Sequence, residues 1–368
     1  MVPAVLRSVA AIVCGIPVLS HSSYAEEFGD FSGSFLVELY EEYIYTPDGD
    51  PDEVNIIYLE GELDASFYLS NSLFIDTTIE FELIDQPDTG LVNIFPVPGQ
   101  GAFIEVLSLN YEEDDFGLFV GKFNPNIFVG FSRTPDLYDT LINEDDLEIT
   151  GQWGGGGYLN FNSDTYGSHR IYGNVFFEDT TDLSGSIITD RGRTSRSDGG
   201  PANTGSPESF SIGSLGGGFD FAPDLDYHVG VVRQAVDIAG GGTDVAPADE
   251  YRVTAALQNQ FSLGDNLTLT PFVEYYHFWN ADGNEGETRD YITGALNLGV
   301  DSWNFGAAYT GRFVSGNTSV NGDEQLFQVS AGYTFSSGWS LSLYLIRLEE
   351  VGSSQNGAVA ILSREFTF

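Results

Sequence analysis

The chain has 368 residues, of which 13 are basic and 55 are acidic, and its formal net charge is −42 at pH 7. So strong a negative charge repels phosphate and excludes nucleic acid as a partner. The composition includes 44 glycines, 28 phenylalanines and 19 tyrosines, which is typical of many amphipathic strands joined by glycine-rich turns.

The first 25 residues have the features of a secretory signal. One basic residue, Arg7, precedes a short apolar run, and a small-residue cleavage pattern ends at Ala25. We therefore expect a signal peptide over 1–25 and a single mature domain over 26–368. The only cysteine, Cys14, lies in the signal, so the mature chain is expected to have neither disulfides nor thiolate chemistry.

Alternation of apolar and polar residues predicts sixteen strands. In chain order these are Phe31–Tyr45, Val54–Leu69, Leu73–Ile84, Ala102–Tyr111, Phe116–Phe123, Leu147–Phe161, Arg170–Glu178, Ser209–Phe221, Asp226–Ile238, Glu250–Leu263, Asn266–Trp279, Arg289–Val300, Trp303–Val314, Gln325–Phe335, Trp339–Glu349 and Gly357–Phe368. No window after the signal approaches the ~20 apolar residues of a membrane-spanning helix.

The predicted connections alternate between tight turns and long loops rich in Gly, Asp and Asn. The tight turns are Ser70–Ser72, Glu112–Asp115, Pro223–Leu225, Gly264-Asp265, Asp301-Ser302 and Ser336–Gly338. This pattern predicts an all-β fold, a transmembrane antiparallel β-barrel of about 16 strands with short periplasmic turns and long extracellular loops. An even strand count brings both termini to one end and leaves no edge exposed. A soluble β-sandwich is the alternative fold.

The alternation also predicts which side chains face lipid. Trp303, Phe305 and the leucines of Trp339–Leu345 lie on apolar faces, and the polar residues between them face a lumen. By the same parity four arginines are candidates for the lumen wall: Arg170, Arg252, Arg289 and Arg312. A polar lumen in a barrel of this size is an aqueous channel.

The last strand ends on two aromatic residues, Phe366 and Phe368. This ending resembles the C-terminal signature of Gram-negative outer-membrane β-barrels, although Ser363 stands where that family prefers glycine. The resemblance implies that Phe366 and Phe368 form an assembly signal for the outer-membrane assembly machinery. A soluble edge strand is the alternative.

A second resemblance lies at the end of the fifth predicted strand. The sequence Val120-Gly121-Lys122-Phe123-Asn124-Pro125 and the loop that follows resemble the corresponding passage of porins, in which the third long loop folds into the barrel and forms its constriction. The resemblance implies a constriction loop over 124–146, an outer-membrane location, contact with lipid and lipopolysaccharide, a homotrimer, and passive diffusion of ions and small hydrophilic solutes.

Acids on such a loop, opposite arginines on the wall, would create a transverse field that sets ion preference. The candidate acids are Asp136, Asp139, Glu144, Asp145 and Asp146. With so few basic residues, we expect cations to be preferred. The alternative is a loop that lies outside as an acidic lid, with arginines that only neutralise lumen carboxylates such as Glu274.

Two other segments leave alternatives open. Three arginines, Arg191, Arg193 and Arg196, lie in the predicted loop Asp179–Glu208, where they either face the acidic loop or entering anions, or belong to a mobile surface loop. The apolar patch Leu91–Val97 suits a subunit contact, or packs on the mouth of its own barrel.

Rival functions are weaker. The mature chain has three histidines, His169, His228 and His277, and none lies in a recognisable hydrolase motif. We therefore expect no enzyme activity, no catalytic residue and no cofactor. A solute-specific channel for a sugar or small organic acid, lined by tyrosines such as Tyr172, Tyr276 and Tyr344, is the main alternative. The acidic turns lack the spacing of a calcium-binding loop, so no metal site is expected.

Overall fold

The computed structural model describes residues 28–45, 54–84, 90–91, 99–127, 147–189, 192–238, 247–316, 322–350 and 353–368. The predicted signal peptide, 1–25, lies outside these residues. Within them, no helix has the length and apolar character needed to cross a bilayer.

The described chain is built almost entirely of strands. They are β1 (Phe31–Tyr45), β2 (Val54–Ser70), β3 (Leu73–Leu83), β4 (Gly90–Leu91), β5 (Gln100–Glu113), β6 (Phe116–Phe123), β7 (Gln152–Ser163), β8 (Gly167–Phe177), β9 (Ser209–Phe219), β10 (Ala222–Gln234), β11 (Glu250–Asn259), β12 (Phe261–Gly264), β13 (Leu267–Trp279), β14 (Glu287–Val300), β15 (Trp303–Gly316), β16 (Glu324–Thr334), β17 (Ser340–Glu350) and β18 (Ser353–Thr367). Short 3-10 helices are η2 (Asp182–Ser184), η3 (Arg196–Asp198) and η5 (Ala281–Gly283).

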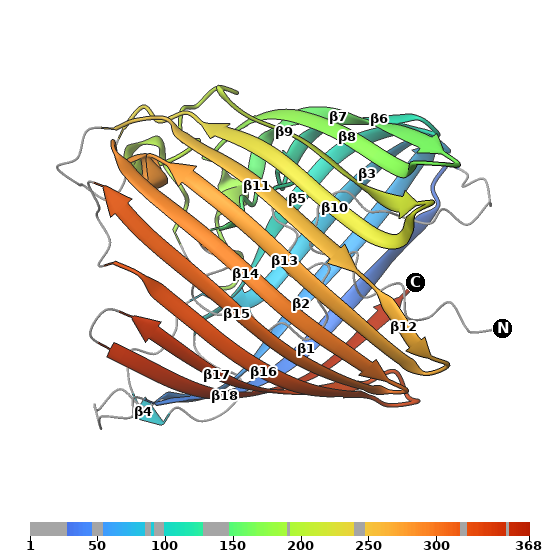
Figure 1. Ribbon diagram of the computed structural model, residues 1–368. Helices are drawn as coiled ribbons and strands as arrows, with labels where there is room; N and C mark the ends of the chain where they lie inside the picture. Colours follow the sequence, from blue (N-terminus) through green and yellow to red (C-terminus); the bar gives the residue numbers. More distant parts are fainter. Residues whose placement is uncertain are drawn as a thin grey trace.

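These strands close into one barrel (Figure 1). Each wall strand pairs antiparallel with its neighbours, and β1 pairs with both β2 and β18, so the ring of strands is closed. β4 lies outside the ring, paired parallel to β2, while β11 and β12 occupy one wall position beside β13. The eighteen labelled strands therefore make a sixteen-stranded barrel, which confirms the predicted fold class.

Two of the predicted strand boundaries are wrong for reasons of local backbone geometry. The strand predicted from Leu147 begins only at Gln152, because Gly151 has a φ of +62° and turns the chain before the wall begins. The strand predicted over Glu250–Leu263 is interrupted at Gln260. Its pairing with β13 lapses between Gln258 and Phe261, where β13 presents Pro271, which has no N–H to donate to the ladder.

One predicted turn is displaced along the chain. The structure turns between Phe219 and Ala222, not over Pro223–Leu225. The register then shifts between Ala222 and Asp226, which absorbs the extra residues of Pro223–Leu225 in a bulge. Pro223 therefore lies in the bulge of this hairpin and not in its regular ladder, and a proline is tolerated at such a position.

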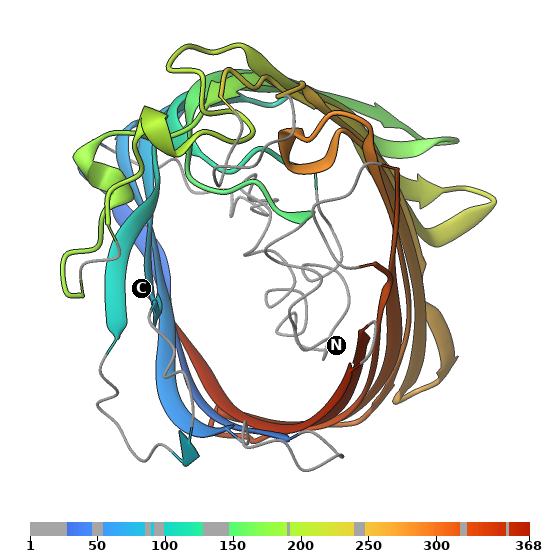
Figure 2. The same cartoon turned by 90° about the vertical axis from the view of Figure 1, so that its left-hand side faces the viewer.

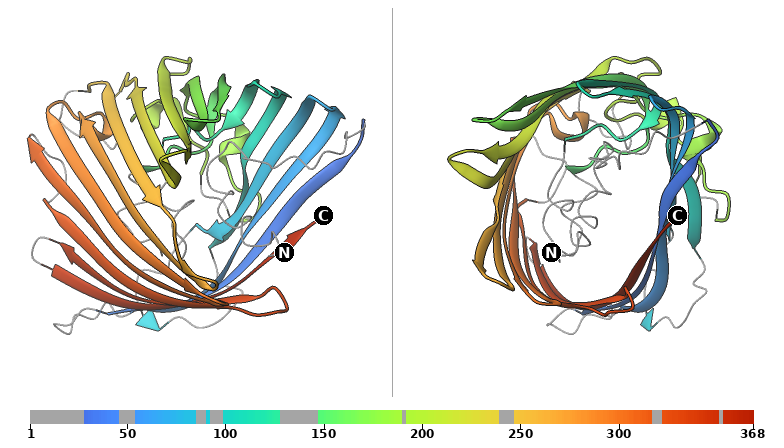
Figure 3. Two further views of the ribbon diagram at one scale, coloured as in Figure 1. Left: turned by 45° about the vertical axis from the view of Figure 1, so that its right-hand side comes forward. Right: turned by 90° about the vertical axis from the view of Figure 1, so that its right-hand side faces the viewer.

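Figure 3 shows from two further sides how the strands curve into one wall. The two faces of this wall follow the predicted alternation. Outward residues are apolar and exposed, among them Ile292, Leu296, Phe305, Leu343 and Leu345. Inward residues on the same strands are polar and buried, for example Thr293, Asn297 and Thr310. An apolar band on the outside of a closed barrel suits hydrocarbon, because the backbone groups of neighbouring wall strands are paired with one another.

Aromatic side chains mark both ends of this band. At the end that carries the short turns and the termini, Phe31 stacks on Phe368 with ring centroids 5.3 Å apart, and Trp303 packs on Tyr333 at 4.8 Å. At the other end, Trp279 packs on His277. Belts of aromatic residues at two levels are typical of barrels that cross a bilayer.

Candidate functional site

The chain leaves the wall after β6 and enters the lumen. Asn124 holds the two ends of this excursion together, because its side-chain carbonyl accepts the N–H of Gly151 at 2.7 Å and its amide donates to Glu105. Figure 2, which looks along the barrel, shows the teal and green segments on either side of the excursion lying inside the wall.

Ile127 and Leu147 reach the far side of the lumen. Both are buried in an apolar cluster with Phe176, Tyr276 and Phe278, which also includes Phe123, Ile149, Tyr291, Leu326 and Leu348. β6 and β13 are six positions apart in the ring of sixteen, so the contact between Ile127 and Tyr276 joins two distant parts of the wall through the lumen. The described ends of the predicted constriction loop therefore lie within the barrel.

The five predicted constriction acids fall outside the described residues. They are Asp136, Asp139, Glu144, Asp145 and Asp146. The segment that carries them runs between Ile127 and Leu147, both of which are packed on the inner wall.

All four predicted arginines lie on the inner face of the wall. Arg252 is opposite Phe278, which is opposite Arg289, so these residues form a row across β11, β13 and β14, and Arg312 follows on β15. Arg170 is not part of this group. It lies near the turn end of β8, where its guanidinium stacks 3.7 Å from the centre of the Tyr158 ring.

The three grouped arginines are paired with nearby acids. Arg252 Nε donates to Glu250 at 2.6 Å, Arg289 pairs with Glu287 and Asp282, and Arg312 pairs with Glu324. The guanidinium groups are almost fully buried. Their charges are thus largely balanced within the wall, and burying them unpaired would be costly.

The wall opposite these arginines is acidic, and this feature was not predicted. We call it the acidic wall: Glu38 on β1, Glu60, Glu62 and Asp64 on β2, and Asp76 and Glu80 on β3. β2 and β11 are eight positions apart in the ring of sixteen, so they face each other. Alternation could have revealed it, since Glu60, Glu62 and Asp64 are spaced two apart and share one face of a strand.

Acidic side chains stand directly opposite one another on the acidic wall. Glu38 pairs in register with Glu60, and Glu62 with Glu80. Such cross-strand pairs destabilise a sheet. In the described part of the chain, no basic residue forms an ion pair with Glu38, Glu62 or Glu80. Mobile cations from the solvent can offset this repulsion.

Exposure differs between the two walls. The residues of the acidic wall are only partly buried. Inward residues of the strands that carry the grouped arginines, such as Glu274, Thr293 and Thr310 on β13 to β15, are buried. Water within the lumen therefore meets carboxylates more than it meets the paired arginines.

The loop between β8 and β9, residues 178–208, covers the outside of the barrel where β6 ends. Figure 2 shows its lime-green turns outside the wall. Residues 100–106 of β5 extend beyond the pairing with β6, and the loop forms hydrogen bonds with this part of the strand. Ile187 N–H donates to the Ala102 carbonyl, and Thr189 Oγ1 donates to the Gln100 carbonyl. The loop thus replaces the wall that β6 would have continued.

An ion pair fastens this loop to β6. Lys122 Nζ lies 2.8 Å from Asp179 Oδ2. Burial alone would raise the pKa of Asp179, but the Lys122 ammonium and the N–H and hydroxyl of Thr181 outweigh it and hold that pKa below its usual value. The predicted arginine cluster lies on this loop, where Arg193 pairs with Asp182 and Arg196 with Asp237. Arg191 lies outside the described residues.

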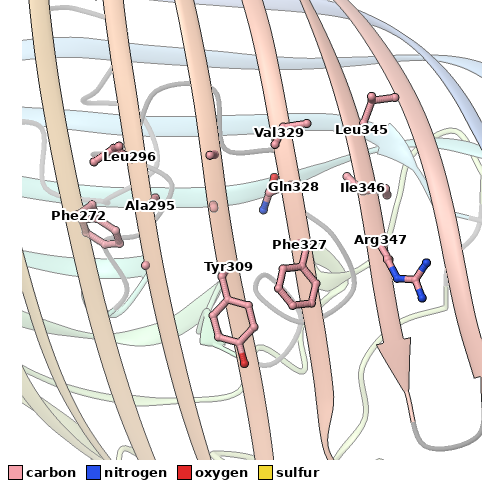
Figure 4. A pocket seen from close by; sticks show the side chains of 13 residues that line it. Phe272, Ala295, Leu296, Tyr309, Phe327, Gln328, Val329, Leu345, Ile346 and Arg347 are labelled. Atoms are coloured by element: carbon pink, nitrogen blue, oxygen red, sulfur yellow. The ribbon is translucent and has the colours of Figure 1, made fainter.

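One hollow in the wall, of about 680 Å³, is lined mainly by outward side chains of β14 to β17. Figure 4 shows Tyr309, Phe327 and Arg347 beside one another on neighbouring strands, with Leu296, Val329 and Leu345 further along. The hollow exists because Gly294 and Ala307 leave the wall thin between these larger residues. Its outward lining residues belong to the apolar outer face of the wall, while Phe272, Ala295 and Gln328 line it from the inner face.

No family model matches the sequence, and no curated protein matches it. Solved structures do match. The outer membrane channel DcaP of Acinetobacter baumannii is 13% identical with a TM-score of 0.55, and the match covers 94% of this chain and 100% of that chain. OmpTdeltaL8, a loop deletion mutant of the Vibrio cholerae outer membrane protein OmpT, is 16% identical with a TM-score of 0.53, over 92% and 100%.

A third match is OccAB4 of Acinetobacter baumannii, at 11% identity and a TM-score of 0.51, over 95% of this chain and 100% of that chain. At such identities the likeness concerns the fold. The chain therefore has the sixteen-stranded barrel fold of outer-membrane porin-like channels.

Proposed function

We propose that the protein is a passive outer-membrane channel for ions and small hydrophilic solutes, and that it prefers cations. The observation that carries the proposal is the acidic wall, which is partly exposed in the lumen and faces arginines already paired with acids. Fixed carboxylates beside a narrow aqueous path concentrate cations and repel anions.

The folded-in loop supports the same proposal. Its described ends cross the lumen from β6 to the wall at β13 and narrow the space that remains. We propose that the acids between Asp136 and Asp146 add to the cation preference. The proposal also includes a homotrimer in contact with lipid and lipopolysaccharide, and no chemical step. His277, for instance, pairs with Asp290 on the outer face, away from the lumen.

The test is the reversal potential of the refolded mature protein in a planar bilayer with a KCl gradient. The double variant Glu62→Gln/Glu80→Gln is expected to lower the cation-to-anion permeability ratio at least roughly twofold. The matched control Glu41→Gln/Glu349→Gln removes two acids from the outer face and is expected to leave the ratio unchanged. An anion-preferring wild-type channel would overturn the proposed cation preference.

A solute-specific channel for a sugar is the second candidate. Tyr40 and Tyr58 stack on the inner face with ring centroids 4.9 Å apart, and aromatic faces of this kind suit sugar rings. Tyr40 is partly exposed, whereas Tyr58 and the tyrosines predicted for such a track, Tyr172, Tyr276 and Tyr344, are buried. Small conductance steps that one sugar blocks would favour this candidate over a general channel.

A further inference from the structure

Each described end of the folded-in loop meets a polar side chain of the opposite wall. The carbonyl of Leu147 accepts a hydrogen bond from Arg252 Nη1 at 3.1 Å, and the carbonyl of Ile127 lies 3.3 Å from the hydroxyl of Tyr276. Arg252 and Tyr276 belong to the paired strands β11 and β13. Two neighbouring strands thus offer one donor to each end of the loop.

Among the described residues, a carboxylate, an aromatic ring and a backbone carbonyl all contact the guanidinium of Arg252. Its Nε donates to Glu250 Oε1 at 2.6 Å, its carbon lies 4.2 Å from the centre of the Phe278 ring, and its Nη1 bonds the Leu147 carbonyl. A planar guanidinium can bond the carboxylate, stack on the ring and bond the carbonyl at the same time, whereas a lysine ammonium cannot reproduce this geometry.

Glu250 is itself held in place from two sides. It is fully buried, and it accepts hydrogen bonds from the side chain of Gln234 on β10 at 2.7 Å and from the N–H of Asp282 in η5 at 2.7 Å. The orientation of Arg252 is therefore set by the wall and by the β13–β14 connection, before the loop makes any contact with it.

Tyr276 contributes less to the polar contact. Its hydroxyl has one proton, and Glu274 Oε1, at 2.9 Å, is a closer and stronger acceptor than the Ile127 carbonyl at 3.3 Å. Its contact with Ile127 is thus mainly packing within the apolar cluster. Arg252 is the main polar anchor.

We propose that Arg252 is a positioning residue, which holds the Leu147 end of the folded-in loop against β11 and β13. Its role then differs from that of a charge that selects ions, because its charge is paired with Glu250 and its Nη1 donates to the backbone of the loop. Only its consequence for conductance rests on the proposed channel function.

The test measures the position of the loop directly. A chain that begins at Glu26 has no cysteine, so Ile149→Cys provides one thiol at a buried position of the returning segment. The rate at which a charged, water-soluble methanethiosulfonate modifies this thiol is compared in three backgrounds, in folded protein in lipid vesicles: Arg252→Gln, Arg252→Lys and the control Arg233→Gln. Arg233 lies on the outer face of β10 and pairs with Asp249.

Both Arg252 variants are expected to raise the rate about tenfold or more, because loss of a charge-assisted hydrogen bond increases the population in which the segment is detached. Arg233→Gln is expected to leave the rate unchanged. If Arg252→Gln does not fold, Arg252→Lys, which keeps the charge, carries the test. If Arg252→Lys leaves the modification rate of the thiol unchanged, the proposed role of Arg252 as an anchor is wrong.

Conductance of the same variants separates this inference from the proposed function. Faster labelling in a protein that conducts no ions would support the anchor and overturn the channel. Unchanged labelling in a conducting protein would overturn the anchor and leave the channel standing.

Discussion

Lys122, the only lysine in the chain, forms an ion pair with Asp179 in which both side chains are almost completely buried, at 3% and 1% exposure. Lys122 also donates to the Leu183 carbonyl at 3.1 Å, while Trp153 Nε1 and the N–H of Thr181 donate to Asp179 Oδ1, each at 2.8 Å. The pair joins β6 to the β8–β9 loop at the place where the wall would otherwise be incomplete.

Lys122→Met is expected to lower the free energy of unfolding by about 3 kcal/mol, because Asp179 is left buried without a cation. Urea unfolding from lipid vesicles, followed by tryptophan fluorescence, measures this difference. Arg193→Gln is the control, because its pair with Asp182 is exposed and an exposed pair contributes little. Equal losses in the two variants would contradict the assigned role of the buried pair.

The stabilisation from Asp179 is expected to depend on pH. The pKa of Asp179 is lower in the folded protein than the value of about 3.9 for an unfolded chain. Its contribution is therefore fully present above about pH 4 and is lost as the pH falls through the folded-state pKa. The unfolding free energy of the wild type should be higher than that of Asp179→Asn, and this difference should be larger at pH 7 than at pH 3. If this difference is the same at both pH values, the pKa of Asp179 is not lowered in the folded protein.

Neutralising the acids of the folded-in loop is expected to lower cation selectivity. The variant Asp136→Asn/Asp139→Asn/Asp146→Asn should bring the reversal potential in a KCl gradient closer to zero, since fewer fixed charges then line the path. The Glu62→Gln/Glu80→Gln variant provides a comparison on the wall itself. If the loop variant keeps the wild-type reversal potential, these acids do not border the path of the ions.

Phe368→Ser is expected to impair assembly in the outer membrane. Phe368 exchanges backbone hydrogen bonds with Gly33, at 3.0 Å in each direction, and stacks on Phe31, so it completes the closure between the first and last strands. The amount of heat-modifiable protein in the outer-membrane fraction measures assembly. Phe221→Ser, an exposed aromatic at another turn of the same end, should assemble normally, and equal defects in both variants would remove any special role of the terminus.

Alternation along the chain predicted the barrel and the inward direction of Arg252, Arg289 and Arg312, because side-chain direction in a strand depends only on parity. It misplaced the segment before Gln152, because Leu147 and Ile149 are also spaced two apart. Their burial comes from contact with Tyr276 and Phe278 across the lumen, and a local pattern contains no information on that contact.

The ion pairs of the arginines were only partly accessible from sequence. Glu250 and Glu287 each precede an arginine by two residues, so parity places them on the same face. Asp282 is different, because it reaches Arg289 from η5, where its φ is +55°. A left-handed backbone at a non-glycine residue is set by the surrounding structure and cannot be predicted from local sequence.

The part of the β5 edge that β6 does not reach places a condition on the order of folding. The backbone groups of Gln100 and Ala102 on that edge are met by Ile187 and Thr189, which follow them by more than eighty residues in the chain. A chain cut after β7 would retain β5 but lack this cover, and would present an unsatisfied strand edge to other chains. The upper rim over β5 is therefore completed by a later part of the sequence, so a polypeptide in transit to the membrane needs protection there until β8 and its loop have arrived.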